Sequence, residues 1–424
     1  RGAGRGMRRG DVRVAVEGVI LLNGSAAGLG GGAQGEDAGG VIYARSSNFS
    51  LTDVEIGGGV AHSGAGLYWR APTLGGGATV NIVGSSMRNN RAAGQGGGAY
   101  VLRPVGNVRL QDNRFTDNAA RDGAGLVITG GEAIVLANRF ARNQANPSDG
   151  RGGALHLVDG AGSVNRNHVA DNGAALGGGF YIAGGAPALT NNIFTANRGG
   201  QTGAALYLEQ VAIDVRHNTL VDNRAGNPAG AAVTVDAPER TTALTNNILT
   251  DHARAVFATD GTILQLRTNL WHNNSINWEG GVQIGAGNLF EPPGFVDAAA
   301  GDFRLAETSA AIDRGQNAGV SDDFDGQTRP ARQGYDIGAD ELQRASLNAT
   351  VTALPPVVAA GEQATLVIQV INNGDVDVNA TIAVTLPASL TPLGPTSWNN
   401  IALVRGAVWT ENLTVRVAAG ASGI

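Results

Sequence analysis

One motif recurs about every 25 residues along this chain, and that repetition constrains the fold more than any other feature. In nearly every copy an asparagine lies two positions before an apolar residue, and another lies three positions after it. The apolar residues are Met87, Phe115, Phe140, Val169, Phe194, Leu220, Leu249 and Trp271. Self-similarity at such a period indicates stacked repeats, in which each unit buries its apolar face against its neighbours.

The pattern within each repeat favours strands over helices. Short apolar alternations of period two are separated by Gly and Asn, and no stretch has the 3.6-residue period of an amphipathic helix. A unit of this length suits a parallel β-helix with three short strands per coil, in which like residues stack at one inter-strand spacing of roughly 4.8 Å. The fold prediction is therefore an all-β parallel β-helix solenoid of about ten coils.

The two asparagine columns are predicted to form corners of the coils. Asparagine tolerates left-handed backbone, and stacked asparagines can hydrogen-bond to one another as amide ladders. The ladder predicted for the second column comprises Asn118, Asn143, Asn172, Asn197 and Asn223. Small residues follow this column and allow a sharp turn before the next strand. In that strand the first and third apolar residues, such as Leu126 and Ile128, should point inward and the residue between them outward.

Composition excludes several classes of function. All 30 basic residues are arginine and the net charge is -6, so no Lys/Arg-dense patch suggests nucleic acid or anionic membrane as a partner. The chain has no cysteine, which excludes disulfides and thiolate metal sites. No apolar run reaches the roughly 18 to 20 residues of a membrane span. We therefore expect no nucleic-acid partner and no membrane insertion within this chain.

The segment after the coils carries the most specific resemblance to a known family. The phrases "GFVDAAAGDFRLAETSAAIDRGQNAG" and "DFDGQTRPARQGYDIGADE" lie within residues 294–341. They resemble the ending of bacterial right-handed parallel β-helix (pectin-lyase-like) surface proteins of the choice-of-anchor type. The resemblance implies a right-handed β-helix over residues 1–343 that ends in a closing segment at 294–341. It also implies a secreted or bacterial cell-surface protein, of which we expect this chain to be a fragment without its targeting and anchoring ends.

The composition changes after the closing segment. Residues 345–424 alternate apolar and polar positions around an "NNGD" turn, which predicts antiparallel strands. This part resembles the immunoglobulin-like repeat modules that are often strung along bacterial surface proteins. It has about 80 residues, whereas such a sandwich usually has about 100, so we expect an incomplete C-terminal β-sandwich.

An enzyme of the pectin-lyase-like class would need carboxylates and a basic residue in one groove. Asp222 and Asp251 fall at equivalent positions of successive coils and could form a carboxylate pair, with Arg142 or Arg224 as the base. The alternative is a solvated corner column of mixed charge, and we favour this alternative.

Acidic residues of the closing segment offer the other candidate chemistry. Asp322, Asp323 and Asp325 in "SDDFDG" could bind calcium as a short acidic turn, although the turn also needs no metal to form. A second group of aspartates is expected to cap turns and to close the last coil. This group comprises Asp313, Asp336 and Asp340. No other cofactor is expected.

The outward position of the strand that follows the glycines is the candidate binding face. Its residues are predicted to be Tyr68, Val101, Val127, His156, Tyr181, Tyr207, Thr234 and Phe257. A row of aromatic rings could stack against sugars, which makes Tyr68, His156, Tyr181, Tyr207 and Phe257 the candidate ligand-binding residues. The alternative is that β-propensity alone favours Tyr and Val on any strand surface.

These patterns leave three functions open. We expect a non-catalytic surface protein that presents an extended face for adhesion or for binding a polysaccharide or cell-surface glycan. The first alternative is a polysaccharide lyase or glycoside hydrolase, and the second is a stalk that only projects other domains. Convergence of several carboxylates and an arginine in one groove would favour the enzyme, whereas an aromatic or polar face without such a cluster would favour the binding protein.

Overall fold

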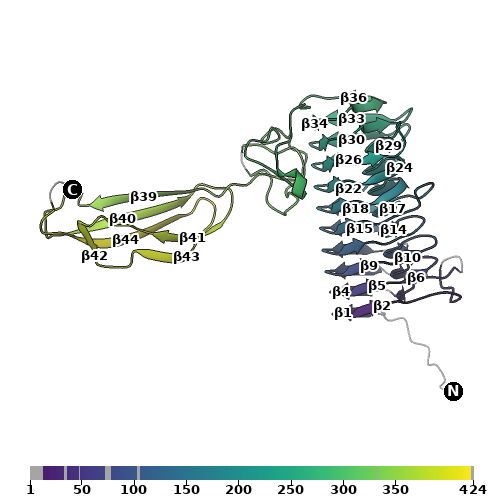
Figure 1. Ribbon diagram of the computed structural model, residues 1–424, viewed down its shortest axis with the longest axis horizontal. Coiled ribbons are helices and arrows are strands. Elements are labelled where there is room, and N and C mark those ends of the chain that lie inside the picture. The colour runs from purple at the N-terminus through teal and green to yellow at the C-terminus, as the bar shows by residue number, and fades with distance from the viewer. Residues whose placement is uncertain are drawn as a thin grey trace, which may run out of the picture. The chain divides into compact units, whose positions relative to one another are not determined.

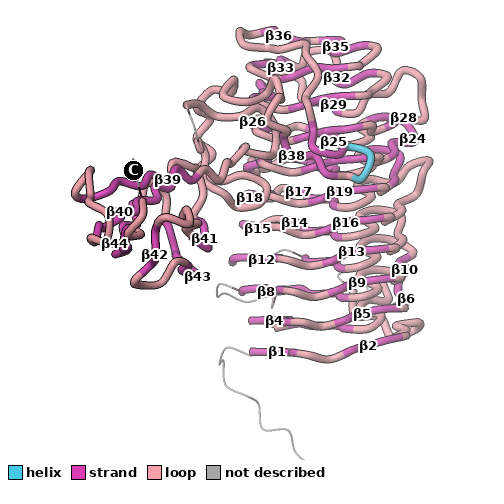
Figure 2. Tube along the Cα trace, turned by 60° about the vertical axis from the view of Figure 1, so that its left-hand side comes forward, coloured by secondary structure: helices cyan, strands magenta, loops and turns pink. Residues whose placement is uncertain are grey.

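A computed structural model describes residues 13–32, 36–46, 48–71, 78–102, 106–331 and 333–421. The chain divides into two compact units, Arg1–Glu341 and Leu342–Ile424. The first unit is a parallel β-helix, in which the chain passes repeatedly through three long parallel sheets of ten or eleven strands. Figure 1 shows its coils stacked along one axis, and Figure 2 shows how the strands of successive coils align. The predicted fold class is confirmed.

Each coil visits the sheets in a fixed order. The first sheet contains β1 (Arg13–Glu17), β4 (Asn48–Thr52), β8 (Thr79–Val83), β12 (Asn107–Gln111), β15 (Glu132–Leu136), β18 (Ala161–Asn165), β22 (Ala188–Thr190), β26 (Asp214–Arg216), β30 (Thr241–Thr245), β33 (Ile263–Arg267) and β36 (Val282–Ile284). The second contains β2 (Ile20–Leu22), β5 (Glu55–Gly57), β9 (Ser86–Arg88), β13 (Arg114–Thr116), β16 (Arg139–Ala141), β19 (His168–Ala170), β23 (Ile193–Thr195), β27 (Thr219–Val221), β31 (Ile248–Thr250) and β34 (Leu270–His272). The third contains β3 (Ile42–Arg45), β7 (Leu67–Arg70), β11 (Ala99–Leu102), β14 (Leu126–Thr129), β17 (Leu155–Val158), β21 (Phe180–Ala183), β25 (Leu206–Glu209), β29 (Val233–Asp236), β32 (Arg254–Ala258) and β35 (Ile276–Gly280).

Short strands between the second and third sheets form a fourth side of several coils. They are β6 (Val60–Ala61) paired with β10 (Arg91–Ala92), and β20 (Gly173–Leu176), β24 (Arg198–Thr202) and β28 (Arg224–Ala225) paired in that order. All of these pairings are parallel.

The predicted apolar column lies inside the coils. Phe115 pairs with Phe140, Phe140 with Val169, and Val169 with Phe194, so the three phenylalanines occupy equivalent positions. All three are fully buried, and the rings of Phe115 and Phe140 stack with centroids 4.9 Å apart. Leu126 belongs to the same core cluster, as does Ile128 two residues later. The core prediction is therefore confirmed.

The predicted asparagine ladder is also present. Each amide donates from Nδ2 to Oδ1 of the asparagine one coil further along, over 2.9 Å from Asn118 to Asn143, 2.9 Å from Asn143 to Asn172 and 3.0 Å from Asn172 to Asn197. The bond from Asn197 to Asn223 is 2.9 Å. The other asparagine column forms a second ladder at the corner between the first and second sheets. It runs through Asn113, Asn138, Asn167, Asn192, Asn218, Asn247 and Asn269.

One detail of the corner prediction is wrong. The left-handed residue is the one before each ladder asparagine, as in Asp117 (φ 57°), Arg142 (φ 54°) and Ala196 (φ 54°). The ladder side chain must point into the coil to reach its neighbours, and the chain makes its sharp turn one residue earlier. Non-glycine residues in this conformation are strained, so the ladder bonds stabilise a corner that is unfavourable in isolation.

Residues 294–341, here called the clasp, contain β37 (Phe295–Asp297), the 3₁₀ helix η1 (Ala298–Ala300) and β38 (Asp302–Leu305). The clasp lies against the side of several coils. Asn246 donates to the carbonyl oxygen of Gln316 over 2.7 Å, and Asn191, two coils earlier, donates to that of Asp322 over 3.0 Å. Closure of the last coil by this segment was therefore a wrong prediction, because its polar groups bond to corner residues of successive coils.

Three clasp aspartates cap turns as predicted. Asp313 accepts from the backbone N–H groups of Gln333 and Gly334, and Asp336 accepts from that of Asp313. Asp340 accepts from the backbone N–H of Leu305 over 2.7 Å.

The second unit contains two antiparallel sheets. Its strands are β39 (Leu347–Leu354), β40 (Gln363–Asn372), β41 (Val378–Ala383), β42 (Leu390–Pro392), β43 (Ser397–Leu403) and β44 (Val408–Val417). One sheet has the order β39-β40-β44-β42, and the other consists of β41 and β43. The apolar face of β40 packs toward the second sheet, with Ile368, Val370 and Leu403 buried. The antiparallel strands agree with the predicted pattern of alternation.

Candidate functional site

The residues that immediately follow the ladder of Asn118, Asn143, Asn172, Asn197 and Asn223, which begins at Asn90, form a surface column on the fourth side of the coils. Each pairs with its equivalent on the next coil, so the column is continuous. It consists of Arg91, Ala119, Gln144, Gly173, Arg198 and Arg224. The ladder determines this alignment, because every ladder asparagine fixes the position of the residue after it. Polar side chains at this column therefore repeat along the axis at about one inter-strand spacing of 4.8 Å.

The next positions of each coil are almost all small, and they leave a groove beside the column. Two hollows of about 400 and 620 Å³ share Gln144, Ala145 and Pro147, so they form one continuous groove. The small residues on its floor are Ala92, Ala93, Ala120, Ala145, Ala174, Gly199, Gly200, Ala225 and Gly226. Gly200 is required, because a Cβ there would lie 2.2 Å from the carbonyl oxygen of Pro147.

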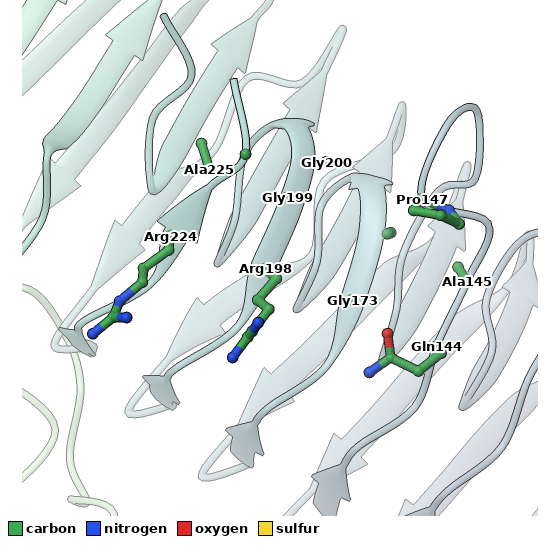
Figure 3. Close-up of a pocket in the computed structure, with 11 residues that line it drawn as sticks. Gln144, Ala145, Pro147, Gly173, Arg198, Gly199, Gly200, Arg224 and Ala225 are labelled. Carbon is green, nitrogen blue, oxygen red and sulfur yellow. The ribbon is translucent and has the colours of Figure 1, made fainter. Parts of the chain in front are cut away.

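Arginine and amide side chains flank this alanine–glycine groove. Figure 3 shows Arg198 and Arg224 extending in the same direction from adjacent strands, with Gln144 beside them across Gly173. Within the described ranges, Arg91 and Arg198 have no ion-pair partner. No Asp or Glu is among the described residues that line the two hollows.

The other two arginines of the groove are ion-paired. Arg224 makes a bidentate bond to Asp222, with its nitrogens 2.6 and 2.7 Å from the two carboxylate oxygens. Arg121 bonds to Asp122 over 2.8 Å. The hydrogen bond that each guanidinium donates to its carboxylate raises the pKa of each of these arginines. Both guanidinium groups are exposed, whereas the Asp122 carboxylate is buried.

The proposed catalytic residues do not converge. Asp222 and Asp251 occupy the same corner column on adjacent coils, but Asp222 is paired with Arg224, and Asp251 accepts hydrogen bonds from Thr250 and Asn273. Arg142 is held by both carboxylate oxygens of Asp117, at 2.8 and 2.7 Å. Arg142 stands three coils before Asp222 in the same corner column, so it does not converge with Asp222 and Asp251, and its assignment as their base is wrong.

The acidic turn of the clasp has structural partners. Asp323 is fully buried and accepts from the backbone N–H groups of Gln327 and Glu341 over 2.7 and 3.1 Å. Asp325 lies 3.9 Å from Arg304, and Asp322 lies 3.9 Å from Arg166. Among the residues with described positions, no group of three His, Cys, Asp or Glu side chains could hold a metal ion. A calcium site at this turn therefore has no support from the geometry.

The aromatic row is aligned as predicted, apart from one position. Tyr181 and Tyr207 stack with centroids 5.2 Å apart, and His156 lies one coil before Tyr181. Val101 was assigned to the row wrongly, because its neighbour Tyr100 pairs with Tyr68. The strand therefore begins one residue earlier in that coil than the pattern suggested.

The prediction that this row forms an exposed platform is wrong. Tyr68 and Tyr181 are 0% and 1% exposed, His156 is 5% exposed and Tyr207 is 8% exposed. The glycine turn before each strand folds back over its outer face, so that a Cβ on Gly177 would lie 2.9 Å from the Cβ of Tyr181. The rings therefore cannot stack against a sugar.

Polar groups in this covered row bond within the protein. Tyr181 donates to Glu209, and Tyr207 donates to Asp236 over 3.1 Å. Burial lowers the pKa of His156 to about 4. Phe257 is partly exposed, with the Arg254 guanidinium 5.8 Å from the centre of its ring.

Comparison with known proteins agrees with this geometry. Residues 35–236 match the family model described as the right-handed beta helix region. The match lies within the first unit and agrees with its fold, a right-handed parallel β-helix. No curated protein and no solved structure matches the chain. Every residue that lines the alanine–glycine groove falls inside the matched region.

The sequence pattern placed the candidate binding face on the third sheet, whereas the alanine–glycine groove lies on the fourth side of the coils. The alanines and glycines after each ladder asparagine were interpreted only as turn formers, although they also form the floor of a groove. Reading the residue after each ladder asparagine as its own column, with arginine at three of six positions, would have found the site. In the part of the chain that the structure describes, no helix has the length and hydropathy needed to cross a membrane.

Proposed function

We propose that this β-helix is a secreted or cell-surface protein that binds an extended anionic polysaccharide in the alanine–glycine groove and does not cleave it. The observation that carries the proposal is the continuous groove with two guanidinium groups, of Arg91 and Arg198, that have no ion-pair partner among the described residues. Arginine binds carboxylate and sulfate groups through parallel N–H donors, so a polymer with regularly spaced anions suits this surface.

The shape of the groove supports a polymer over a small ligand. A shallow groove of stacked small residues runs across several coils, and a chain lying along the axis can contact each of them. Gln144 offers an amide donor and acceptor for sugar hydroxyl groups between the charged positions. Each contact would be weak, but several along one chain add up to useful affinity.

The carboxylate partners argue against the enzymatic alternative. A lyase or hydrolase needs acidic side chains near the scissile bond, and the described lining residues of the groove include none. Asp117 and Asp222, at its margin, are each engaged by an arginine.

The covered aromatic row favours a second candidate, a stalk that projects other domains. Its rings stack and hydrogen-bond in the manner of structural residues. The anion-binding experiment decides between the two, because a stalk would retain no polysaccharide.

Retention on immobilised polygalacturonate, alginate and neutral dextran tests the proposal. We expect retention on the two anionic polymers only, weakening as salt is raised because the charges are exposed. Arg198→Ala should lower affinity about tenfold, which corresponds to one charge-assisted contact of about 1.4 kcal/mol.

Arg114→Ala is the matched control, since Arg114 is an exposed arginine on the second sheet. It should bind as the parent does. Equal binding of all three polymers, or no binding to any of them, would contradict the proposal. Shortening of the polymer during incubation would instead support the enzyme.

A further inference from the structure

The second unit leaves one long strand edge open. β39 pairs with β40 on one side and ends the four-stranded sheet on the other. Seven of its eight residues are exposed, and Ala353 is the partly buried one. The outer edge of β39 therefore presents backbone N–H and C=O groups that can pair with another strand.

The core-facing side of β39 is also incompletely covered. Val351 lies directly opposite Ile368, which is 2% exposed, yet Val351 itself is 54% exposed. Leu347, on the same face, is 45% exposed. The facing sheet has only β41 and β43, so the apolar side chains of the edge strand lack a neighbour on their outer side.

The usual protections of an edge strand are absent here. Natural edges commonly carry a charged residue, a proline or a bulge that prevents pairing. β39 contains no charged residue and no proline, and its pairing with β40 runs without a register shift from Leu347 to Leu354. No charged residue occurs anywhere from position 345 to 361. A strongly charged partner strand would therefore have no opposite charge to pair with on this edge.

The sequence of β39 is complementary to itself. Residues 349–353 read Ala-Thr-Val-Thr-Ala, a palindrome centred on Val351. In an antiparallel pair about a twofold axis at Val351, each of these residues faces an identical one. The alanines and valine then share the core side of the sheet, while the threonines pair on the other side, where cross-strand Thr–Thr contacts are favourable. An isologous interface requires this kind of self-complementarity.

We propose that β39 pairs antiparallel with β39 of a second copy of this chain, with Val351 at the twofold axis, to join two four-stranded sheets into one of eight strands. The pairing satisfies the open backbone groups and places each exposed valine beside its equivalent. It links two copies through their C-terminal units and requires nothing of the alanine–glycine groove, so it stands independently of the proposed glycan binding.

Sedimentation velocity of the full chain over a range of concentrations tests the proposal. We expect a species of twice the chain mass to grow with concentration. Val351→Lys should abolish it, because two ammonium groups would meet at the axis. Gln369→Lys is the matched control, since it adds the same charge at an exposed position of the central strand β40, and it should still dimerise.

A cysteine variant locates the axis. The chain has no cysteine, so Val351→Cys introduces one unique thiol. Directly opposed residues of an antiparallel pair lie within disulfide range, and mild oxidation should give a covalent dimer of Val351→Cys and none of Gln369→Cys. A parent chain that stays monomeric, a Val351→Lys variant that still dimerises, or equal cross-linking of both cysteine variants would each overturn the proposal.

Discussion

The asparagine ladder shows how one small side chain can satisfy many buried polar groups. Asn172 accepts from both the backbone N–H and the amide of Asn143, and its own amide donates to Asn197 and to the carbonyl oxygens of Phe140 and Ala170. Neighbouring coils therefore share hydrogen bonds at a corner whose backbone is strained. Stability of the corner depends on the continuity of the column.

Replacing Asn172 by alanine should lower the free energy of unfolding by about 1 to 3 kcal/mol, because buried groups above and below lose their partners. Chemical denaturation followed by circular dichroism measures this. Asn81→Ala, at an exposed position of the first sheet, should change stability by less than about 0.5 kcal/mol. Equal effects of the two substitutions would contradict the ladder's role.

His252 replaces asparagine between Asn223 and Asn274 of this ladder and behaves as its structural equivalent. Its Nδ1 accepts from the backbone N–H of Asn223 over 3.2 Å, and its Nε2 lies 3.2 Å from the carbonyl oxygen of Leu220. This assignment requires a neutral ring with the proton on Nε2. Burial of the ring lowers the pKa of His252 to about 4.

His252→Asn should therefore make the protein more resistant to acid. A histidine whose pKa is lowered in the folded state contributes stability above its ordinary pKa of 6.5, and this stability is lost as pH falls through about 4. The loss amounts to up to about 3 kcal/mol between pH 7 and pH 4. We expect the variant to lose less stability than the parent over this range in denaturant titrations. His272→Asn, on the following coil, should follow the parent.

Packing inside the coils is the main stabilising interaction at the level of single strands. Phe140 stacks on Phe115 and makes an edge contact with Phe180, with ring centroids 5.9 Å apart. Phe140→Ala should cost on the order of 3 to 5 kcal/mol. Because coils contact only their neighbours, hydrogen exchange should quicken most in β13, β16 and β19. Uniform acceleration along all coils would show that the array unfolds as one unit.

A buried ion pair stabilises the clasp from within its own segment. Arg329 bonds to Glu341 over 2.7 Å with both side chains almost fully buried, and Arg329 also donates to the carbonyl oxygen of Gly338. Burial raises the pKa of Asp340 to about 7. Its protonated form is therefore favoured in the folded clasp.

Stability from Asp340 is fully present below its ordinary pKa of 3.8 and is lost as pH rises through about 7. Asp340→Asn keeps an acceptor for the N–H of Leu305 and removes this loss. We expect the clasp of the parent to become more susceptible to limited proteolysis between pH 5 and pH 8 than that of the variant. Asp302→Asn, which changes a partly exposed carboxylate in the same segment, should retain the pH dependence of the parent.

At the scale of the whole molecule, the repeating residues of the coils could be predicted from the sequence. The segments that cover the outside of the coils could not. The apolar and asparagine columns identified the coils because each residue contacts its own equivalents. Burial of Tyr181 could not be predicted in this way, because it depends on a turn that folds back over the strand. The position of the clasp could not be predicted from the repeat either, because it depends on hydrogen bonds from Asn246 and Asn191 to residues far along the chain.

The alanine–glycine groove could have been recognised in part. Arg91, Arg198 and Arg224 stand at one position of the repeat, and the periodicity predicts that they align. Which of them is neutralised could not be read from the repeat. Asp222 reaches Arg224 within its own coil, whereas Arg198 follows Ala196 at the equivalent position and has no such carboxylate. The guanidinium of Arg224 is thus paired with Asp222, whereas that of Arg198 on the adjacent coil can bind an anionic ligand.

This difference leads to a prediction about affinity. Asp222→Asn keeps a residue that tolerates the left-handed corner and removes the negative charge that holds Arg224. Since an exposed ion pair holds its partners only weakly, we expect the variant to bind an anionic polysaccharide up to about fivefold more tightly than the parent. Asp251→Asn makes the same change one coil further along, where the carboxylate bonds to Thr250 and Asn273, and should leave affinity unchanged. Isothermal titration with polygalacturonate at low salt measures both. Weaker binding by Asp222→Asn would mean that the carboxylate itself contacts the ligand, and an equal gain in both variants would mean that only the net charge of the protein matters.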